Sequence, residues 1–373
     1  MGMGAEHGRG QSAPLYRNQL EPTALINRFN ACPPDGFEVL QLPQDTPGFV
    51  APFDLLTTAE PAVKKKIEGL PLYRFWSRLL RIQTAFVGTT VSEYALFPRQ
   101  SDPAGWVMQV RQALGKRYRL SIIKDIPQNS PLLDTDANAH AEQVRAACAD
   151  EGFVMVEGQA LAYVPMDFTS TDEYLARLSA SRRKDIRRKL RKRDELTIRR
   201  VATGDDYFRD TQVLATYYAL YDNVYAQSEV HFDRLSQRFF DAVLQDSTSG
   251  GVVFEYWHGA TLIGYNLCFV EGGKLIDKYV GFQYPQAREF NLYFISWWVN
   301  LEFALERGLS HYVAGWTDPQ IKAYLGASFT FTQHAVYVRN PLLRSLARRF
   351  AGVFESDKQW SDRQDASTSR TGS

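Results

Sequence analysis

The clearest signal for the fold lies between residues 251 and 282, which read GVVFEYWHGATLIGYNLCFVEGGKLIDKYVGF. Three runs in this stretch are rich in β-branched and aromatic residues: Gly251–Trp257, Leu262–Phe269 and Lys274–Phe282. Short glycine-bearing segments separate them, at residues 258–260 and 271–273. Such turns join neighbouring antiparallel strands, so the stretch predicts a three-stranded meander.

Helices and strands alternate on both sides of this meander. Upstream, the apolar spacing predicts helices at Tyr207–Gln227 and Gln237–Gln245. Downstream, Phe290–Arg307 has a helical period and ends before Gly308, where a C-cap glycine belongs. A strand at His311–Ala314, a short helix at Gln320–Leu325 and a strand at Phe331–Val338 complete this half.

The first half of the chain mixes the same two element types, and a length of 373 residues suits two domains. We predict an α+β protein, each domain being a mostly antiparallel mixed sheet flanked by helices. The helices expected in this half are Thr23–Ala31, Trp106–Leu114 and His140–Asp150, and the strands are Phe37–Leu42, Tyr118–Ile126, Phe153–Glu157 and Leu161–Pro165, with a β-rich stretch at Trp76–Pro98.

A strongly basic segment lies between the halves. Residues 182–193 hold nine basic side chains and one acid, although the whole chain has a formal net charge of only +1. Ser170 and Glu173 form a capping-box pattern, which predicts one amphipathic helix starting there. Its cations could bind a polyanion, with Arg183, Arg187 and Arg188 as contacts, or could simply be solvated. A membrane-surface role is disfavoured because the apolar stripe is narrow.

Composition excludes several protein classes. No segment approaches the roughly 20 apolar residues needed to span a bilayer, and Met1–Pro14 lacks the apolar core of a secretory signal. The three cysteines are far apart, which argues against a disulfide framework and a zinc site, so we expect no metal and a cytoplasmic location. Residues 1–18 and 354–373 are expected to be disordered tails.

Several landmarks, taken in order, resemble Fem-like proteins of the GNAT acyltransferase superfamily. They are the run from Tyr174 to Arg188, Gly264-Tyr265, Lys278-Tyr279-Val280-Gly281, and Gly308 through Gly315 to Lys322 and Leu325-Gly326-Ala327. The resemblance covers residues 168–344. It implies two tandem GNAT-like domains, at residues 19–168 and 201–353, joined by a basic connecting helix at residues 169–200, with acyl transfer to an amine as the activity.

In that fold one strand parts from its neighbour, and its free backbone groups hold the pantetheine arm of the donor. Here the strand would be residues 274–282, with Val280 and Phe282 as contacts. The donor's pyrophosphate would meet amides between Arg288 and Asn291 at the following helix start. However, residues 283–291 lack the glycines that coenzyme A-dependent members carry there. The donor could therefore be acyl-coenzyme A, an acyl-carrier protein or, as in Fem-type enzymes, aminoacyl-tRNA.

Candidate catalytic groups come from the same landmarks. Asp277 is the expected general base, and strand alternation would put it on the same face as Tyr279. A strand-rim pair of Asp277 with Arg288 or Lys278 is the structural alternative. Tyr324 takes the position of the acid in this superfamily, with a core or interface tyrosine as the alternative. Lys322 matches the family's Lys-x-x-Leu-Gly landmark as a phosphate or carboxylate contact, with an ordinary surface lysine as the alternative.

Three further residues are candidates for binding the acceptor. Trp316 and Asp318 follow a strand end, where side chains commonly face a binding site, although a turn before Pro319 explains Asp318 equally well. Tyr221 could line an acceptor site or belong to the core. His334 sits within an alternating strand, where a structural role is favoured.

Three functions remain open from the sequence. The first is an N-acyltransferase that moves an acyl group from a thioester donor to a small amine acceptor. The second is a Fem-type aminoacyl-tRNA-dependent transferase acting on a peptidoglycan precursor or peptide. The third is a non-catalytic module whose basic helix binds nucleic acid or anionic lipid.

Overall fold

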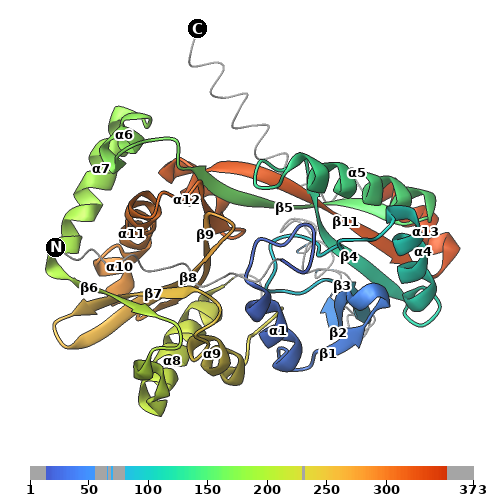
Figure 1. The fold of residues 1–373 in the computed structure, drawn as a ribbon, viewed down its shortest axis with the longest axis horizontal. Coiled ribbons are helices and arrows are strands. Elements are labelled where there is room, and N and C mark those ends of the chain that lie inside the picture. The colour runs from blue at the N-terminus through green and yellow to red at the C-terminus, as the bar shows by residue number, and fades with distance from the viewer. Residues whose placement is uncertain (1–13, 55–64, 66–68, 70–79, 229–231, 351–373) are drawn as a thin grey trace, which may run out of the picture.

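The computed structural model describes residues 14–54, 65, 69, 80–228 and 232–350. Its strands form a single sheet of 11 strands that runs through both halves of the chain (Figure 1). The C-terminal tail expected at 354–373 lies outside the described residues. Tyr16 and Asn18 are buried, so the expected N-terminal tail ends before residue 18, because this segment packs into the protein.

The first half contains α1 (Thr23–Ala31), β1 (Glu38–Gln41), η1 (Pro43–Asp45), β2 (Pro47–Asp54), β3 (Arg81–Val87), α4 (Pro103–Leu114), β4 (Leu120–Gln128), α5 (Thr135–Asp150) and β5 (Val154–Pro165). Strand β5 is continuous, whereas two strands around Gly158 were expected. Gly158 is needed because a Cβ there would overlap Thr332 on the adjoining strand.

The second half contains α6 (Thr171–Ala176), α7 (Ala180–Leu190), η3 (Arg191–Glu195), β6 (Thr197–Ala202), η4 (Asp206–Arg209), α8 (Thr211–Gln227), α9 (Gln237–Leu244), β7 (Gly251–His258), β8 (Thr261–Glu271), β9 (Lys274–Phe282), α10 (Gln286–Glu289), α11 (Leu292–Glu306), β10 (His311–Gly315), α12 (Pro319–Leu325), β11 (Ser328–Val338) and α13 (Pro341–Phe350). The predicted meander is β7, β8 and β9, paired antiparallel in that order.

The single basic helix predicted between the halves is wrong, because the chain forms two helices there. Ser170 caps α6 as expected, but Ser179 accepts a hydrogen bond from the amide of Arg182 and so starts α7 as a separate helix. Residues 197–202 then form β6, which pairs with β7 at the sheet edge. The break lets α7 take its own direction beside α6 (Figure 1).

The strand order is β1-β2-β3-β4-β11-β5-β10-β9-β8-β7-β6. Only two neighbouring pairs are parallel, β3 with β4 and β9 with β10. The remaining pairs are antiparallel. This confirms the predicted fold class, a mostly antiparallel mixed sheet flanked by helices.

The two halves exchange strands where they meet. Strand β11, from the end of the chain, lies between β4 and β5 and pairs antiparallel with both. Strand β5 in turn pairs with β10 of the second half. The two domains were predicted as consecutive parts of the sequence, at residues 19–168 and 201–353. In the structure, one continuous sheet runs through both parts.

Helices cover both faces of the second half. On one face α7 and α11 pack over a core that includes Phe254, Leu275 and Phe282. On the other, α8 and α9 cover Val253, Tyr265 and Tyr279. Figure 1 shows these two layers on either side of β7, β8 and β9. Each large apolar side chain buried in this way contributes roughly 1.5–3 kcal/mol, so β9 is firmly held between the layers.

A candidate functional site at the open edge of strand β9

Strand β9 parts from β10 after three residues, as the resemblance to Fem-like proteins implies. Lys274, Leu275 and Ile276 pair in parallel with His311, Tyr312 and Val313 of β10, and the ladder then stops. On its other side β9 stays paired with β8 as far as Phe282. Among the described strands, none continues the ladder beside residues 277–282, which we call the open edge of β9.

A β-bulge occurs where the two strands part. Cys268 of β8 pairs with Asp277, but Leu267 pairs with Tyr279, so Lys278 is an extra residue on β9. A bulge reverses the alternation of side chains beyond it. Asp277 therefore points to the α11 face, and Tyr279 points to the α8 and α9 face. The prediction that these two side chains share one face is wrong for this reason.

The carboxylate of Asp277 is held within the core. Its Oδ2 accepts hydrogen bonds from Asn300 Nδ2 at 2.8 Å and from the Tyr312 hydroxyl at 3.0 Å. Burial raises the pKa of Asp277, while the Tyr312 hydroxyl and the charge of Lys322 act in the opposite direction. These contacts anchor the start of the open edge, and they do not support the role of general base predicted for Asp277.

Tyr279 lies on the other face, in contact with the rings of Phe239 and Phe240 at centroid distances of 6.0 Å and 5.3 Å. Its hydroxyl oxygen is buried and has no hydrogen-bond partner among the described residues. Burial raises the pKa of Tyr279, and the carboxylates of Asp233, Glu21 and Glu93 are near enough to raise it further. The phenol therefore stays protonated, and its O–H group is an unused hydrogen-bond donor.

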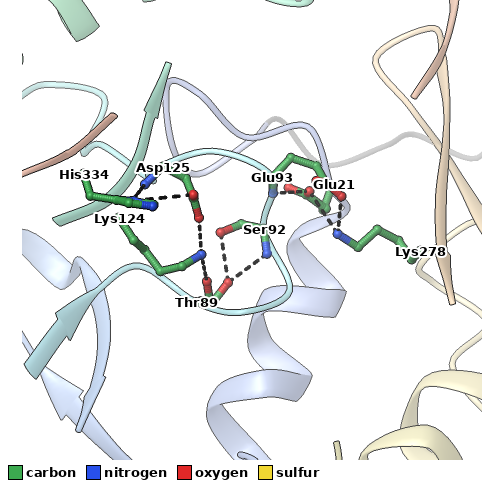
Figure 2. A network of polar contacts seen from close by, with 8 residues as sticks. All are labelled: Glu21, Thr89, Ser92, Glu93, Lys124, Asp125, Lys278 and His334. Atoms are coloured by element: carbon green, nitrogen blue, oxygen red, sulfur yellow. Dashed lines mark hydrogen bonds and ion pairs between the residues drawn. The ribbon is translucent and has the colours of Figure 1, made fainter. Parts of the chain in front are cut away.

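The bulge residue Lys278 reaches into the first half of the chain. Its Nζ lies 2.5 Å from Glu93 Oε1 and 3.5 Å from Glu21 Oε1. The backbone amide of Glu93 also donates to Glu21 Oε1 at 2.6 Å, which ties the two acidic residues together (Figure 2). Burial acts to lower the pKa of Lys278, but the two carboxylates have the larger effect, so the pKa is raised. We call Glu21, Glu93 and Lys278 the carboxylate cluster.

Lys322 lies at the point where β9 and β10 separate. Its Nζ and the carbonyl oxygen of Asp277 each lie 3.8 Å from the position that a Cβ on Gly315 would occupy. The side chain is 4% exposed, and no hydrogen bond to Nζ is found within the described part of the chain. Burial lowers the pKa of Lys322 to about 8, against the opposing charges of Asp277, Glu93 and Asp318. It is an available cation beside the open edge.

Tyr324 does not lie at this site. Its hydroxyl donates to Asp185 Oδ2 of α7 at 2.9 Å, and its ring packs against Phe294. Within the described residues, no contact joins Tyr324 to Asp277 or to the cluster. Helix α12 turns Tyr324 toward α7 and buries Lys322, so the acid role predicted for Tyr324 does not fit this geometry.

The sequence analysis missed Tyr293, in the first turn of α11. Burial raises the pKa of Tyr293, and the charges of Asp318 and Asp277 raise it further. Tyr284 is also near Asp318, whose charge adds to the burial that raises its pKa. Tyr293 was overlooked because its helix is apolar on nearly all sides and gives no polar pattern to single it out.

The amides predicted to bind a pyrophosphate are already used. The N–H groups of Arg288, Glu289, Phe290 and Asn291 donate to carbonyl oxygens of residues 285, 286 and 288, because α10 forms a turn before α11. The Arg288 side chain donates instead to Gln227 Oε1 at 2.7 Å. The anion site expected at residues 288–291 is therefore not formed by these amides. Val280 and Phe282 lie on the open edge of β9, but the carbonyl oxygen of Phe282 accepts a hydrogen bond from Asn223 Nδ2 at 3.3 Å.

The other predicted contacts fall in two places. Tyr221 is a core residue whose hydroxyl accepts a hydrogen bond from the amide of Leu235 at 3.1 Å. Trp316 packs edge-to-face on Tyr94, 6.4 Å between centroids, and joins a core cluster with Ile276 and Val313. Asp318 is exposed at the start of α12, with a left-handed φ of 55°. Only Asp318 thus remains close to the open edge on the solvent side.

A hollow on α7 gathers the cations of that helix. It is lined by Ala180, Arg183, Lys184, Arg187, Arg188 and Arg191, positions that repeat at three and four residues and so share one face. Arg188 pairs with Asp185 at 2.7 Å, and Arg187 lies 3.8 Å from the exposed Asp172. The opposite face packs on α11 and α12. The predicted residues Arg183, Arg187 and Arg188 do share this cationic face.

His334 has a structural role. Its Nδ1 accepts a hydrogen bond from the backbone amide of Asp125 at 3.0 Å, where β4 and β11 shift register. Lys124 pairs with the Asp125 carboxylate and donates to the carbonyl oxygen of Thr89 (Figure 2). Burial lowers the pKa of His334 and keeps the ring neutral. This agrees with the interpretation of His334 as a satisfied strand residue.

A family model for FemAB-like proteins, described as peptidoglycan biosynthesis/recognition, matches residues 108–368. The chain belongs to the FemAB-like family. This confirms the resemblance to Fem-like proteins found in the sequence. No protein with a curated description matches the sequence. Among the described helices, none is long and apolar enough to cross a membrane.

Solved structures extend the likeness to the first half of this FemAB-like chain. The C-terminal domain of a putative lysylphosphatidylglycerol synthetase from Agrobacterium fabrum is 14% identical, with a TM-score of 0.54 over 91% of this chain and 93% of that one. FemX is 12% identical, with a TM-score of 0.49 over 88% and 94%. The synthetase of Bacillus licheniformis is 11% identical, with a TM-score of 0.48 over 90% and 98%. At this identity the first of these establishes a shared fold.

Proposed function

We propose that this protein is an aminoacyltransferase that moves an amino acid from aminoacyl-tRNA to an amine. The single observation that carries the proposal is the open edge of β9 beside Lys322. Main-chain groups of the open edge before Phe282 could hold the acyl part of a donor in one orientation, and a nearby cation could stabilise the charge of the tetrahedral adduct. A cytoplasmic location fits the three cysteines, which are free and buried.

Two features favour a tRNA donor over coenzyme A. The amides at residues 288–291 already donate to backbone carbonyl oxygens, and the sequence around them contains no glycine loop. They therefore do not provide the expected binding site for the pyrophosphate of coenzyme A. The cationic face of α7 is suited to a longer polyanion. Its buried side contacts α12, where Arg182 donates to the carbonyl oxygen of Ala323, the residue after Lys322. A nucleic acid on α7 would therefore be near the open edge.

The chemistry assigns roles to two residues. The amine nitrogen would attack the ester carbonyl carbon, and the ammonium of Lys322 would stabilise the negative oxygen that forms. The C–O bond to the tRNA then breaks, and the leaving oxygen takes a proton from the hydroxyl of Tyr293. The charges of Asp318 and Asp277 act on the pKa values of both side chains, which supports assigning them to one site.

The direct test compares donors. Purified protein is incubated with a mixture of radiolabelled aminoacyl-tRNAs or with acetyl- and longer acyl-coenzyme A, and a panel of amine acceptors is added. We expect transfer from aminoacyl-tRNA only. Lys322→Met should abolish transfer and leave the melting temperature nearly unchanged. Transfer from acyl-coenzyme A alone would overturn the tRNA assignment and restore the thioester reaction, and no transfer from either donor would favour a non-catalytic binding protein.

A further inference from the structure

The carboxylate cluster contains more hydrogen-bonding capacity than the protein uses. Glu21 is fully buried and Glu93 is 2% exposed. Each uses one oxygen for Lys278 or for the Glu93 amide, while Glu21 Oε2 and Glu93 Oε2 have no partner among the described residues. A buried carboxylate oxygen without a donor is costly. The cluster is therefore built as if a further donor group belongs there.

The charge of the surroundings indicates which kind of donor fits. Two carboxylates face one lysine in the cluster, and the carboxylate of Asp233 is near enough to raise the pKa of Tyr279. The Tyr279 hydroxyl also has no hydrogen-bond partner among the described residues, and the charges of Glu21 and Glu93 act on its pKa. Within the cluster acceptors outnumber donors, and above the pKa of Glu21, which burial raises to about 7, two carboxylates face the single charge of Lys278. A group with several N–H donors and a positive charge satisfies both conditions.

The cluster adjoins the open edge of β9. Lys278 belongs to that edge, and its side chain is 7% exposed, although the residue as a whole is partly exposed. Asp277 and Val280 on either side are partly exposed as well. Solvent therefore reaches the strand at the bulge but not the carboxylates. A ligand group would reach the cluster from the open edge, where the proposed function places the acyl donor.

We propose that Glu21 and Glu93 bind the ammonium group of the acceptor substrate at the open edge of β9. The inference rests on the proposed function for the identity of the acceptor. It moves acceptor binding from the C-terminal half, where Asp277 was the expected base, to two carboxylates of the N-terminal half. Lys278 holds these carboxylates in place and leaves one oxygen of each for the ligand.

The transfer step balances with these groups. The bound ammonium gives one proton to Glu21 and becomes a neutral amine. Its nitrogen forms the new C–N bond with the ester carbonyl carbon, and the C–O bond to the tRNA breaks. The second proton lost by nitrogen replaces the one that the leaving oxygen takes from Tyr293. The products are an amide, a free 3′-hydroxyl and one proton, which Glu21 releases to solvent.

The test measures binding without any donor. n-Butylammonium is the probe, and n-butanol is a neutral molecule of the same shape, each titrated calorimetrically into the full-length protein. We expect binding of n-butylammonium only, weakened at least about tenfold in Glu21→Gln and in Glu93→Gln. Each variant keeps one carboxylate for Lys278, and its melting temperature checks folding. Glu195→Gln, an exposed carboxylate elsewhere, should bind as the wild type does.

The outcomes separate this inference from the proposed function. Equal binding of both probes, or equal affinity in all three variants, would show a structural cluster only and would overturn the inference. That result would leave the donor comparison untouched. Conversely, selective n-butylammonium binding in a protein that transfers nothing from aminoacyl-tRNA would support the ammonium site and reject the proposed donor.

Discussion

Lys278 of β9 and Glu93 of the segment after β3 are joined by a distance of 2.5 Å between Nζ and Oε1, although 185 positions separate them in the chain. The pair is buried and lies where the two halves meet. It therefore couples the geometry of the open edge to the N-terminal half. A substitution of either residue should therefore alter the structure of both halves.

Replacing Lys278 with Met should destabilise the protein strongly. The substitution leaves Glu21 and Glu93 buried without a counter-charge, and breaking a buried pair in this way costs about 3–5 kcal/mol. Urea unfolding at pH 8 measures the change in the free energy of unfolding. The matched control is Lys192→Met, whose exposed pair with Glu195 contributes less than about 1 kcal/mol. Equal effects would mean that the buried pair is energetically unimportant.

The free energy of unfolding should fall as pH rises from about 4.5 to about 7. Burial raises the pKa of Glu21 to about 7 from an ordinary 4.5, against the opposing charge of Lys278. In this window the folded protein holds a proton that the unfolded chain has lost, so stability decreases with pH and levels off above 7. The total change is on the order of 3 kcal/mol.

Glu21→Gln identifies the source of that slope. An amide side chain at this position cannot titrate, so urea unfolding of the variant should show a flatter profile over the same range of pH. The charged groups facing Glu21 are Glu93 and Lys278. If the variant keeps the wild-type profile, another group accounts for the slope.

Gly281→Ala should disrupt the packing of α8 on β9. A Cβ at this position would lie 2.2 Å from a ring carbon of Tyr265 and 2.9 Å from Leu220 Cβ. Overpacking of this kind typically costs about 1–3 kcal/mol. Gly259→Ala, in a turn with nothing within 4 Å, should cost only its backbone strain, roughly 1 kcal/mol. Thermal unfolding of both variants compares them, and a larger loss for Gly259→Ala would contradict the packing argument.

Tyr293→Phe should lower turnover by about 10²–10⁴, the usual range for a lost general acid. Tyr324→Phe should leave turnover near the wild-type value and remove only the hydrogen bond to Asp185. Initial rates with aminoacyl-tRNA measure both. A wild-type rate for Tyr293→Phe, or a large loss for Tyr324→Phe, would reverse the two assignments.

Reversing charge on α7 should weaken RNA binding without affecting the fold. Lys184→Glu and Arg191→Glu change two cations that line the hollow on α7. Each lost phosphate contact should reduce the slope of log affinity against log salt by about 0.7–0.9. Filter binding of tRNA at several salt concentrations measures this slope. Arg209→Glu, far along the chain on η4, is the control, and an equal loss there would indicate non-specific attraction.

The sequence predicted the order of most elements because it depends on local patterns, whereas the parting of β9 was expected from the resemblance to the family. Alternation and glycine turns mark the meander, and the landmarks around Lys278 and Lys322 mark the family. No local sequence pattern indicates the bulge at Lys278. The bulge depends on how β9 pairs with two residues of β8, Leu267 and Cys268. That single extra residue is why Asp277 and Tyr279 were assigned to one face.

Contacts between distant segments could not be predicted from the sequence. Glu21 and Glu93 lie 72 positions apart, and no local pattern in the sequence connects them. Tyr293 is one of 19 tyrosines and belongs to an apolar helix. Tyr324 was expected at the site because it takes the position of the acid in the superfamily that the sequence resembles. On α12, however, the two side chains leave the helix in different directions.

The position of β11 between β4 and β5 affects the order in which the protein can fold during synthesis. The gap in the N-terminal part of the sheet stays open until residues 328–338 have left the ribosome. Until then β4 and β5 each present an unpaired edge to other chains. The nascent protein should therefore depend on chaperones until its last strand is made, and a stop codon shortly before residue 328 should produce an aggregating fragment rather than a folded N-terminal half.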